Sequence, residues 1–104
     1  MTGHPTSSLL GMGARARTVV IGTAGVRSAL KREELAMVVA ASDHSERTED
    51  KVLKLARAQG VPVVVGPDTK TLGRDLGRDV IQVVGVKDAS LAKGIADRAL
   101  DDGR

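Results

Sequence analysis

The sequence has no cysteine and no phenylalanine, tyrosine or tryptophan among its 104 residues. The lack of cysteine excludes disulfides, thiol nucleophiles and thiolate metal sites. The lack of aromatic rings excludes base stacking on aromatic side chains, on which most binders of single-stranded RNA and DNA depend. His4 and His44 are the only imidazoles, and they lie far apart in the sequence. We therefore expect no metal site and no cofactor.

Long apolar runs are missing as well. None approaches the ~20 residues that cross a bilayer, so we expect no association with membranes. The start of the sequence, MTGHPTSSLLGMGARAR, lacks the basic segment, apolar core and small-residue cleavage site of a secretion signal, which predicts a cytoplasmic location. The net charge of +3 mildly favours a polyanionic partner.

The length and composition are those of one soluble domain. Hydrophobic residues make up 41% and charged residues 28% of the chain, which is typical of globular proteins. A chain of 104 residues supports a single core, which we expect over about residues 9–100, and no cleft between domains. Any function must therefore be carried by one face or one edge of residues 1–104.

Apolar runs alternate with segments of helical periodicity. The Val-rich runs predict strands buried on both faces at residues 18–21, 37–41, 61–65 and 80–86. Apolar residues at helical spacing predict helices over residues 24–32, 48–59, 69–76 and 90–100. We expect Leu9, Leu10 and Met12 to cover the core. This order predicts the fold class α/β, a three-layer α/β/α sandwich with a four-stranded mixed central sheet.

The predicted helices carry recognisable ends and apolar stripes. Asp68 is a good N-terminal cap, and Gly60 is a good stop for the helix before it. The stripe on that helix is formed by Val52, Leu55, Ala56 and Gln59, with Leu53 beside them. The last helix has a stripe of its own, formed by Leu91, Ala92, Ile95, Ala96 and Ala99.

The segment GTAGVRSALKR, residues 22–32, joins a strand to a helix through a Gly-rich turn. The start of such a helix has unpaired backbone N–H groups and a positive dipole end, which suit phosphate or another electron-rich group. A plain strand-to-helix connection remains the alternative. GTAG lacks the Lys of a phosphate-binding P-loop and the spaced glycines of a dinucleotide fingerprint, which argues against mononucleotide binding.

The same predicted helix has a basic side. Ala24, Ser28 and Arg32 share one face, and Arg27 and Lys31 lie on the neighbouring stripe. A basic helix with its N-terminus toward the ligand can hold a nucleic-acid backbone while its first residues meet base edges. A solvated charged face is the alternative interpretation.

Two further segments follow predicted strands or precede them. SDHSE, residues 42–46, places Asp43 and His44 where α/β sheets carry binding groups, although it can also be a solvated turn. Three neighbouring residues do not build a catalytic triad, so hydrolase chemistry is not expected here. In TKTLGRDLGRDV, residues 69–80, Gly73 and Gly77 would weaken a helix and predict a close approach to neighbouring backbone.

Four segments together resemble the ribosomal protein L7Ae and L30e family, whose members bind kink-turn RNA. GTAGVRSAL is similar to the family's GTNEVTKAL, VVAASD to its VVAAxD, GVPVVV to its NVPYVxV, and KTLGRDLGRDV to its xxLGRACGxxV. The resemblance extends over about residues 9–96. LLGMGARAR and VVGVKDASLAKGI look most like the small bacterial members that resemble ribosomal proteins.

The resemblance implies one non-enzymatic RNA-binding domain with an α/β/α fold. Its partner would be structured, sharply bent RNA or rRNA, alongside ribosome or ribonucleoprotein components. RNA contacts would come from the start of the helix after Gly22 and Thr23, the loop after the second strand and the loop before the last strand. With the basic helix face included, the predicted contact residues are Gly22, Thr23, Ala24, Gly25, Arg27, Ser28, Lys31, Arg32, Asp43, Arg78, Asp79, Val80 and Ile81.

The chain departs from the family pattern at the residues that read guanine edges. Ala24 and Gly25 stand where the family has Asn and Glu, and Ser28 stands where it has Lys. Each lost polar reader costs ~1–3 kcal/mol of base discrimination. Two alternatives to RNA binding therefore stay open: a protein-interaction module that kept the fold but lost the RNA site, and a small-ligand or nucleotide binder using residues 22–25.

Overall fold

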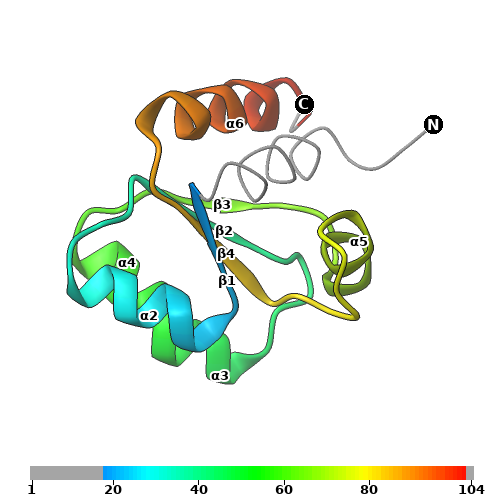
Figure 1. Cartoon of the computed structure of the whole chain (residues 1–104), viewed down its shortest axis with the longest axis horizontal. Coiled ribbons are helices and arrows are strands. Elements are labelled where there is room, and N and C mark those ends of the chain that lie inside the picture. The colour runs from blue at the N-terminus through cyan, green and yellow to red at the C-terminus, as the bar shows by residue number, and fades with distance from the viewer. Residues whose placement is uncertain (1–17, 103–104) are drawn as a thin grey trace.

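Strands and helices alternate along the computed structural model, which describes residues 18–102 (Figure 1). The strands are β1 (Val19–Ile21), β2 (Met37–Ala40), β3 (Val63–Val65) and β4 (Val83–Val86). The helices are α2 (Thr23–Lys31), α5 (Thr69–Asp75), α6 (Ala89–Asp102) and a continuous helix composed of α3 (Glu46–Thr48), the π-helical turn η1 (Glu49–Leu53) and α4 (Lys54–Ala58). Our expectations for His4, Leu9, Leu10, Met12 and the side chain of Ala99 lie outside the described residues.

The four strands form one mixed sheet in the order β1-β4-β2-β3. β4 lies antiparallel to both of its neighbours, whereas β2 and β3 are parallel. Side chains alternate between the two faces of each strand, as the pleat of a β-strand requires. In β2, Val38 and Ala40 contribute to one core, while Met37 and Val39 contribute to the other.

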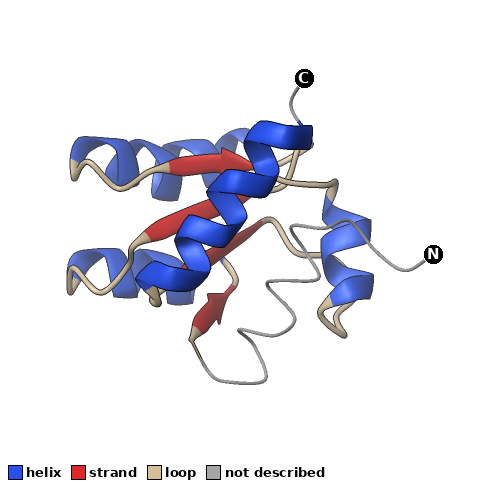
Figure 2. Cartoon of the chain, turned by 90° about the horizontal axis from the view of Figure 1, so that it is seen from above, coloured by secondary structure: helices blue, strands red, loops and turns tan. Residues whose placement is uncertain are grey.

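The two cores place the helices in layers on opposite faces of the sheet. Val26 and Leu30 of α2 pack with Val52 and Ala56 of the η1–α4 helix against one face. Leu72 of α5 packs with residues of α6 against the other face, where Figures 1 and 2 show α6 lying across the sheet. The structure therefore confirms the predicted three-layer α/β/α sandwich with a four-stranded mixed sheet. Within residues 18–102, no helix combines the length and apolar character needed to cross a membrane.

The predicted start of the last strand was wrong by three residues. β4 begins at Val83, because Ile81 before it bonds to α5 instead of to a neighbouring strand. The N–H of Ile81 donates to the carbonyl of Thr69 at 3.0 Å, and the apolar side chain of Val80 is 55% exposed. The apolar run therefore begins before the strand, in a loop that packs against α5.

The predicted apolar stripe of the long helix was also partly wrong. Val52, Leu53 and Ala56 are fully buried, whereas Leu55 is only half-buried and Gln59 is exposed. Val52 and Leu53 both belong to the π-helical turn, and both are buried in the core between this helix and the sheet. The predicted helix ends agree better, because Asp68 caps α5 through the N–H of Thr71 and Gly60 has a φ of 75°.

Candidate functional site

The segments that the sequence analysis identified as candidate binding sites lie at one end of the sheet. In the strand register, Ile21 faces Val84, and Ala40 faces both Val83 and Val65. The carboxyl ends of β1, β2 and β3 and the start of β4 therefore meet at the same end, which we call the loop end. The start of α2, residues 41–45, the start of α5 and residues 76–82 all lie there. The three predicted contact segments are thus brought together.

The first turn of α2 has no capping side chain at the loop end. Gly22 precedes the helix with a φ of 99°, and its own N–H donates to the carbonyl of Val83 at 3.0 Å. In contrast, side-chain oxygens of Ser45, Asp68 and Asp88 accept hydrogen bonds from the first turns of α3, α5 and α6. The start of α2 therefore keeps donors that the other helix starts satisfy internally.

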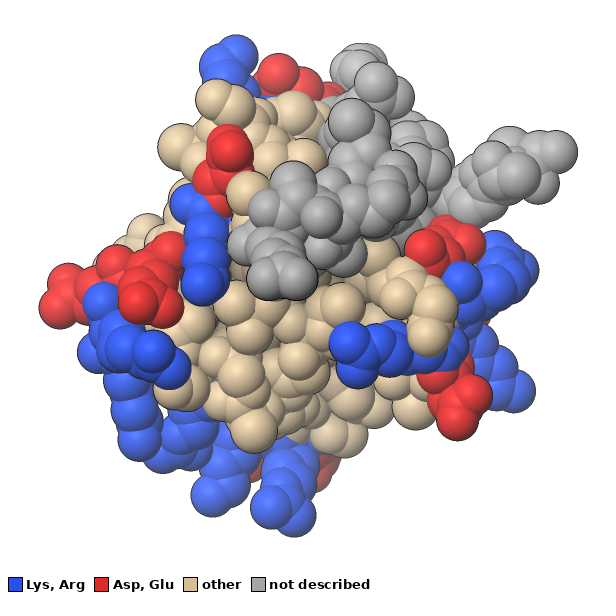
Figure 3. Space-filling view, viewed as in Figure 1, with Lys and Arg blue, Asp and Glu red and all other residues tan. Residues whose placement is uncertain are grey.

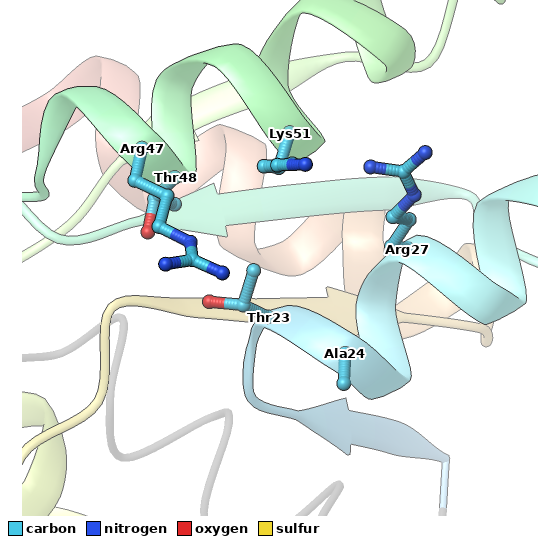
Figure 4. A pocket seen from close by; sticks show the side chains of 6 residues that line it. All are labelled: Thr23, Ala24, Arg27, Arg47, Thr48 and Lys51. Atoms are coloured by element: carbon cyan, nitrogen blue, oxygen red, sulfur yellow. The ribbon is translucent and has the colours of Figure 1, made fainter.

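A cleft of about 330 Å³ opens between the start of α2 and the helix opposite it (Figure 4). We call it the basic cleft. In Figure 4 the side chain of Arg47 extends toward Thr23, and those of Arg27 and Lys51 point into the space between the two helices. Figure 3 shows Lys and Arg gathered over this region, along the lower side of the view. The cleft is lined by Thr23, Ala24, Arg27, Arg47, Thr48 and Lys51.

The cations of the basic cleft differ from several neighbouring ones in their partners. Lys54, Arg57 and Arg74 pair with Asp50, Glu49 and Asp75 respectively. Among the described residues, no ion pair involves Arg27, Arg47 or Lys51, and no carboxylate lines the cleft. The sequence analysis missed Arg47 and Lys51, although their separation of four residues on a helical segment places them on one face.

Two basic residues at the end of α2, Lys31 and its C-cap Arg32, lie outside the lining of the basic cleft. The Arg32 guanidinium donates to the Ser28 hydroxyl at 2.7 Å, so these two predicted contact residues are held together on the surface. Lys31 is exposed in the last turn of the helix. Gly25 is close-packed, because a Cβ there would lie 2.8 Å from Cγ1 of Val20.

Asp43 has a structural partner at the loop end. Its carboxylate accepts one hydrogen bond from the N–H of Thr69 at 2.8 Å and another from the Thr69 hydroxyl at 3.2 Å. The loop after β2 is thereby tied to the start of α5. A second hydrogen bond ties the loop after β2 to the loop before β4, since the side-chain oxygen of Gln82 accepts from the N–H of Ser45 at 2.7 Å.

His44 lies beside these links but faces the helix rather than the loop end. One ring nitrogen, Nδ1, lies 2.7 Å from the carbonyl of Ala41, and Nε2 lies 3.0 Å from Glu49, which also accepts from Arg57. The hydrogen bond to the Ala41 carbonyl, helped by Glu49, raises the pKa of His44 above its ordinary value of 6.5. Hydrogen bonds from Arg57 and then His44 lower the pKa of Glu49.

The loop before β4 is shaped by two glycines. A Cβ on Gly73 would lie 2.5 Å from the carbonyl oxygen of Asp79, so the predicted close approach to neighbouring backbone is confirmed there. Gly77 instead adopts a φ of 77°, with open space around it. These turns leave Arg78, Asp79 and Val80 exposed at the loop end and bury Ile81, which is 3% exposed.

Residues 18–102 contain no group of three or more His, Asp or Glu side chains that could hold a metal ion. Two carboxyl groups among these residues, Glu49 and Asp68, have a lowered pKa, and a nearby hydrogen-bond donor explains each shift. At the loop end, the uncapped start of α2 and the cations of the basic cleft offer hydrogen-bond donors and positive charge.

Known proteins share this architecture. The chain matches the Ribosomal protein L7Ae/L30e/S12e/Gadd45 family over residues 6–95. An "RNA-binding protein" of Bacillus pumilus (strain SAFR-032) is 34% identical over 67 residues, which cover 64% of this chain and 82% of that protein. A protein of unknown function from Bacillus halodurans has a TM-score of 0.83 and 33% identity, covering 90% of this chain and 95% of that one.

A more distant structure has the same fold. The Giardia lamblia 15.5kD RNA binding protein has a TM-score of 0.71 at 20% identity, covering 91% of this chain and 82% of that one. Fold and loop end together define a small three-layer α/β/α domain with an uncapped helix start beside a basic cleft. With a match that spans residues 6–95, the chain belongs to the Ribosomal protein L7Ae/L30e/S12e/Gadd45 family.

Proposed function

We propose that this protein binds RNA through its loop end and acts without catalysis. The observation that carries the proposal is the coincidence, at one end of the sheet, of an uncapped helix start, the basic side of α2 and the exposed Arg78. Backbone N–H groups and Arg or Lys side chains are the donors that RNA phosphates and sugars accept. Membership of the family and the name of the Bacillus pumilus relative support the same function.

The predicted contact residues have different roles in this proposal. Residues 22–25 offer backbone N–H groups and the Thr23 hydroxyl, while Arg27, Lys31, Arg32 and Arg78 supply positive charge. Val80 is an exposed apolar side chain that can pack against a base or sugar. Asp43 and Ile81 act by positioning, because Asp43 holds Thr69 and Ile81 is buried.

The RNA that we propose is structured, with a sharp bend of the kink-turn type. It is part of rRNA or of the RNA in another ribonucleoprotein complex of the cytoplasm. Ala24 and Gly25 offer no side-chain donor or acceptor to guanine edges. Recognition therefore depends on backbone shape and phosphate positions more than on base identity. A modest preference for bent over straight RNA is the expected consequence.

A competition series tests the proposal. Full-length protein is mixed, at one fixed salt concentration, with a labelled kink-turn RNA, and unlabelled kink-turn RNA, plain duplex or an unrelated hairpin competes. The expected result is binding of all three RNAs, with the kink-turn RNA preferred. No retention of any RNA even at low salt would contradict the proposal and favour a protein-interaction module that kept the fold.

A further inference from the structure

The basic cleft is more than an extension of the α2 start, because half of its lining comes from another helix. Arg47 and Lys51 stand on α3 and η1, separated by 20 or more residues from Arg27 on α2. Three cations that converge from two helices, with no carboxylate among the lining residues, repel one another unless an anion joins them. Their convergence therefore points to an anionic ligand.

The backbone under these two cations is firmly held. Thr48, between them, is 3% exposed, and its hydroxyl donates to the Gln82 side chain at 3.3 Å. Val52, directly after Lys51, is fully buried in the core between the helix and the sheet. The backbone positions of Arg47 and Lys51 are thus set before a ligand arrives, which lowers the part of the ordering cost that the backbone would add.

The residues that line the basic cleft also indicate which part of a nucleic acid it would bind. The cleft has no large apolar or aromatic side chain on which a base could stack, and no Asp or Glu to accept hydrogen bonds from ribose hydroxyls. Guanidinium and ammonium groups with a threonine hydroxyl match phosphate oxygens instead. A phosphate chain fits this chemistry better than a nucleoside does.

We propose that the basic cleft binds the phosphodiester backbone of a helical RNA arm that runs from the loop end along α2 and η1. The inference rests on the proposed function and extends it, since it makes Arg47 and Lys51 RNA contacts that neither the sequence pattern nor the family resemblance implied. The loop end then holds the bend of the RNA, and the basic cleft holds one flanking arm.

The test compares the double variant Arg47→Ala/Lys51→Ala with the control Lys87→Ala/Lys93→Ala. The control removes the same charge from exposed positions past the opposite end of the sheet and on α6. Affinities are measured over a range of salt for a bent RNA with a long flanking arm and for the same RNA with that arm cut short. Thermal melting checks that both variants remain folded.

For the long-armed RNA, the slope of log affinity against log salt should flatten by about one to two in the cleft variant and stay unchanged in the control. The short-armed RNA should show little difference between the two variants. An unchanged slope in a cleft variant whose parent binds RNA would overturn the inference and leave the proposed function standing. Parent protein that binds no RNA would overturn both.

Titration with inorganic phosphate and AMP separates a polymer site from a small-ligand site. Weak binding of both, with no saturation at millimolar concentration, is the expected result. Saturable binding of AMP that the cleft variant loses, with RNA affinity unaffected, would overturn the inference in favour of a small phosphorylated ligand.

Discussion

The carboxylate of Asp43 accepts hydrogen bonds from both the N–H and the hydroxyl of Thr69, across 26 residues of sequence. This pair joins the loop after β2 to the first turn of α5, where a negative charge is also favoured by the helix dipole. The pair thereby holds one segment of the proposed RNA-binding surface, the loop after β2, against α5. In the proposed function, Asp43 therefore positions the loop after β2 rather than contacting RNA directly.

Asp43→Ala should lower the free energy of unfolding by about 1–2 kcal/mol, because the N–H and hydroxyl of Thr69, which is 8% exposed, lose their acceptor. Denaturant unfolding measures this. Asp43→Asn keeps one acceptor oxygen and should lose about half as much. Equal stability of the parent and the Ala variant would show that the link is not formed in solution.

Gly73→Ala should destabilise the fold by about 1–3 kcal/mol, because its Cβ would overlap the backbone of Arg78 and Asp79 rather than a movable side chain. The variant should also weaken RNA binding by displacing the loop before β4. The matched control is Gly77→Asn, since residue 77 has open space and Asn tolerates a positive φ. If Gly73→Ala melts no lower than Gly77→Asn, the close approach is not real.

His44 gives the protein a pH-dependent contribution to stability. Only a protonated imidazole can donate from both ring nitrogens, so the folded state favours the charged form and the pKa of His44 lies above 6.5. A raised folded-state pKa adds stability below the unfolded value, and this stability is lost as pH rises through the folded value. The pKa of Glu49 is lowered, so this carboxylate remains ionised in the same range.

The loss of stability on His44→Ala should therefore be larger near about pH 5.5 than near about pH 8.5. Denaturant unfolding of the parent and the variant at both pH values measures the difference, and NMR titration of the ring proton gives the pKa directly. A difference that is the same at both pH values, or a measured pKa below 6.5, would contradict the hydrogen-bond assignment.

The sequence predicted the layers and helix ends because these depend on local patterns. Val-rich runs and helical spacing identify most of the buried residues, although Val65 at the end of β3 is 63% exposed. Asp68 caps the start of α5, and Gly60 ends the helix before β3, through local backbone chemistry. The late start of β4 could not be predicted, because the apolar pattern of Val80 and Ile81 is typical of a strand. Only the folded chain shows that Ile81 bonds to Thr69 in α5. The π-helical turn was equally hidden, because the spacing of apolar residues does not distinguish it from an α-helix.

The placement of the candidate site's segments was predicted in part for the same reason. Residues 22–25, Asp43 and the loop before β4 were found as segments, and the sheet order then brought them together. Arg47 and Lys51 were missed because their significance arises from the helix they face, which is a tertiary relationship. The hydrogen bond of Asp43 could not be predicted either, because its partner Thr69 is remote in sequence. Asp43 was predicted only as an RNA contact.

Restoring polar side chains that can hydrogen-bond to guanine edges on α2 should increase selectivity for kink-turn RNA. Ala24→Asn/Ser28→Lys should raise the preference over plain duplex by at least ~10-fold, which is ~1.4 kcal/mol, in competition binding at fixed salt. Adding Gly25→Glu should cost stability, because its Cβ meets Cγ1 of Val20 at 2.8 Å. Unchanged discrimination in the folded double variant would mean that α2 is not placed against the RNA bases.

The most direct test of RNA binding at the loop end is NMR mapping of the backbone amides while a bent, double-stranded RNA is titrated into the full-length protein. The proposal predicts the largest shifts in three segments: residues 22–27, residues 43–51 and residues 78–81. Amides of α6 and of residues 33–36 should hardly move, because they lie away from the loop end. Shifts concentrated on α6, or no shifts at saturating RNA, would contradict the account.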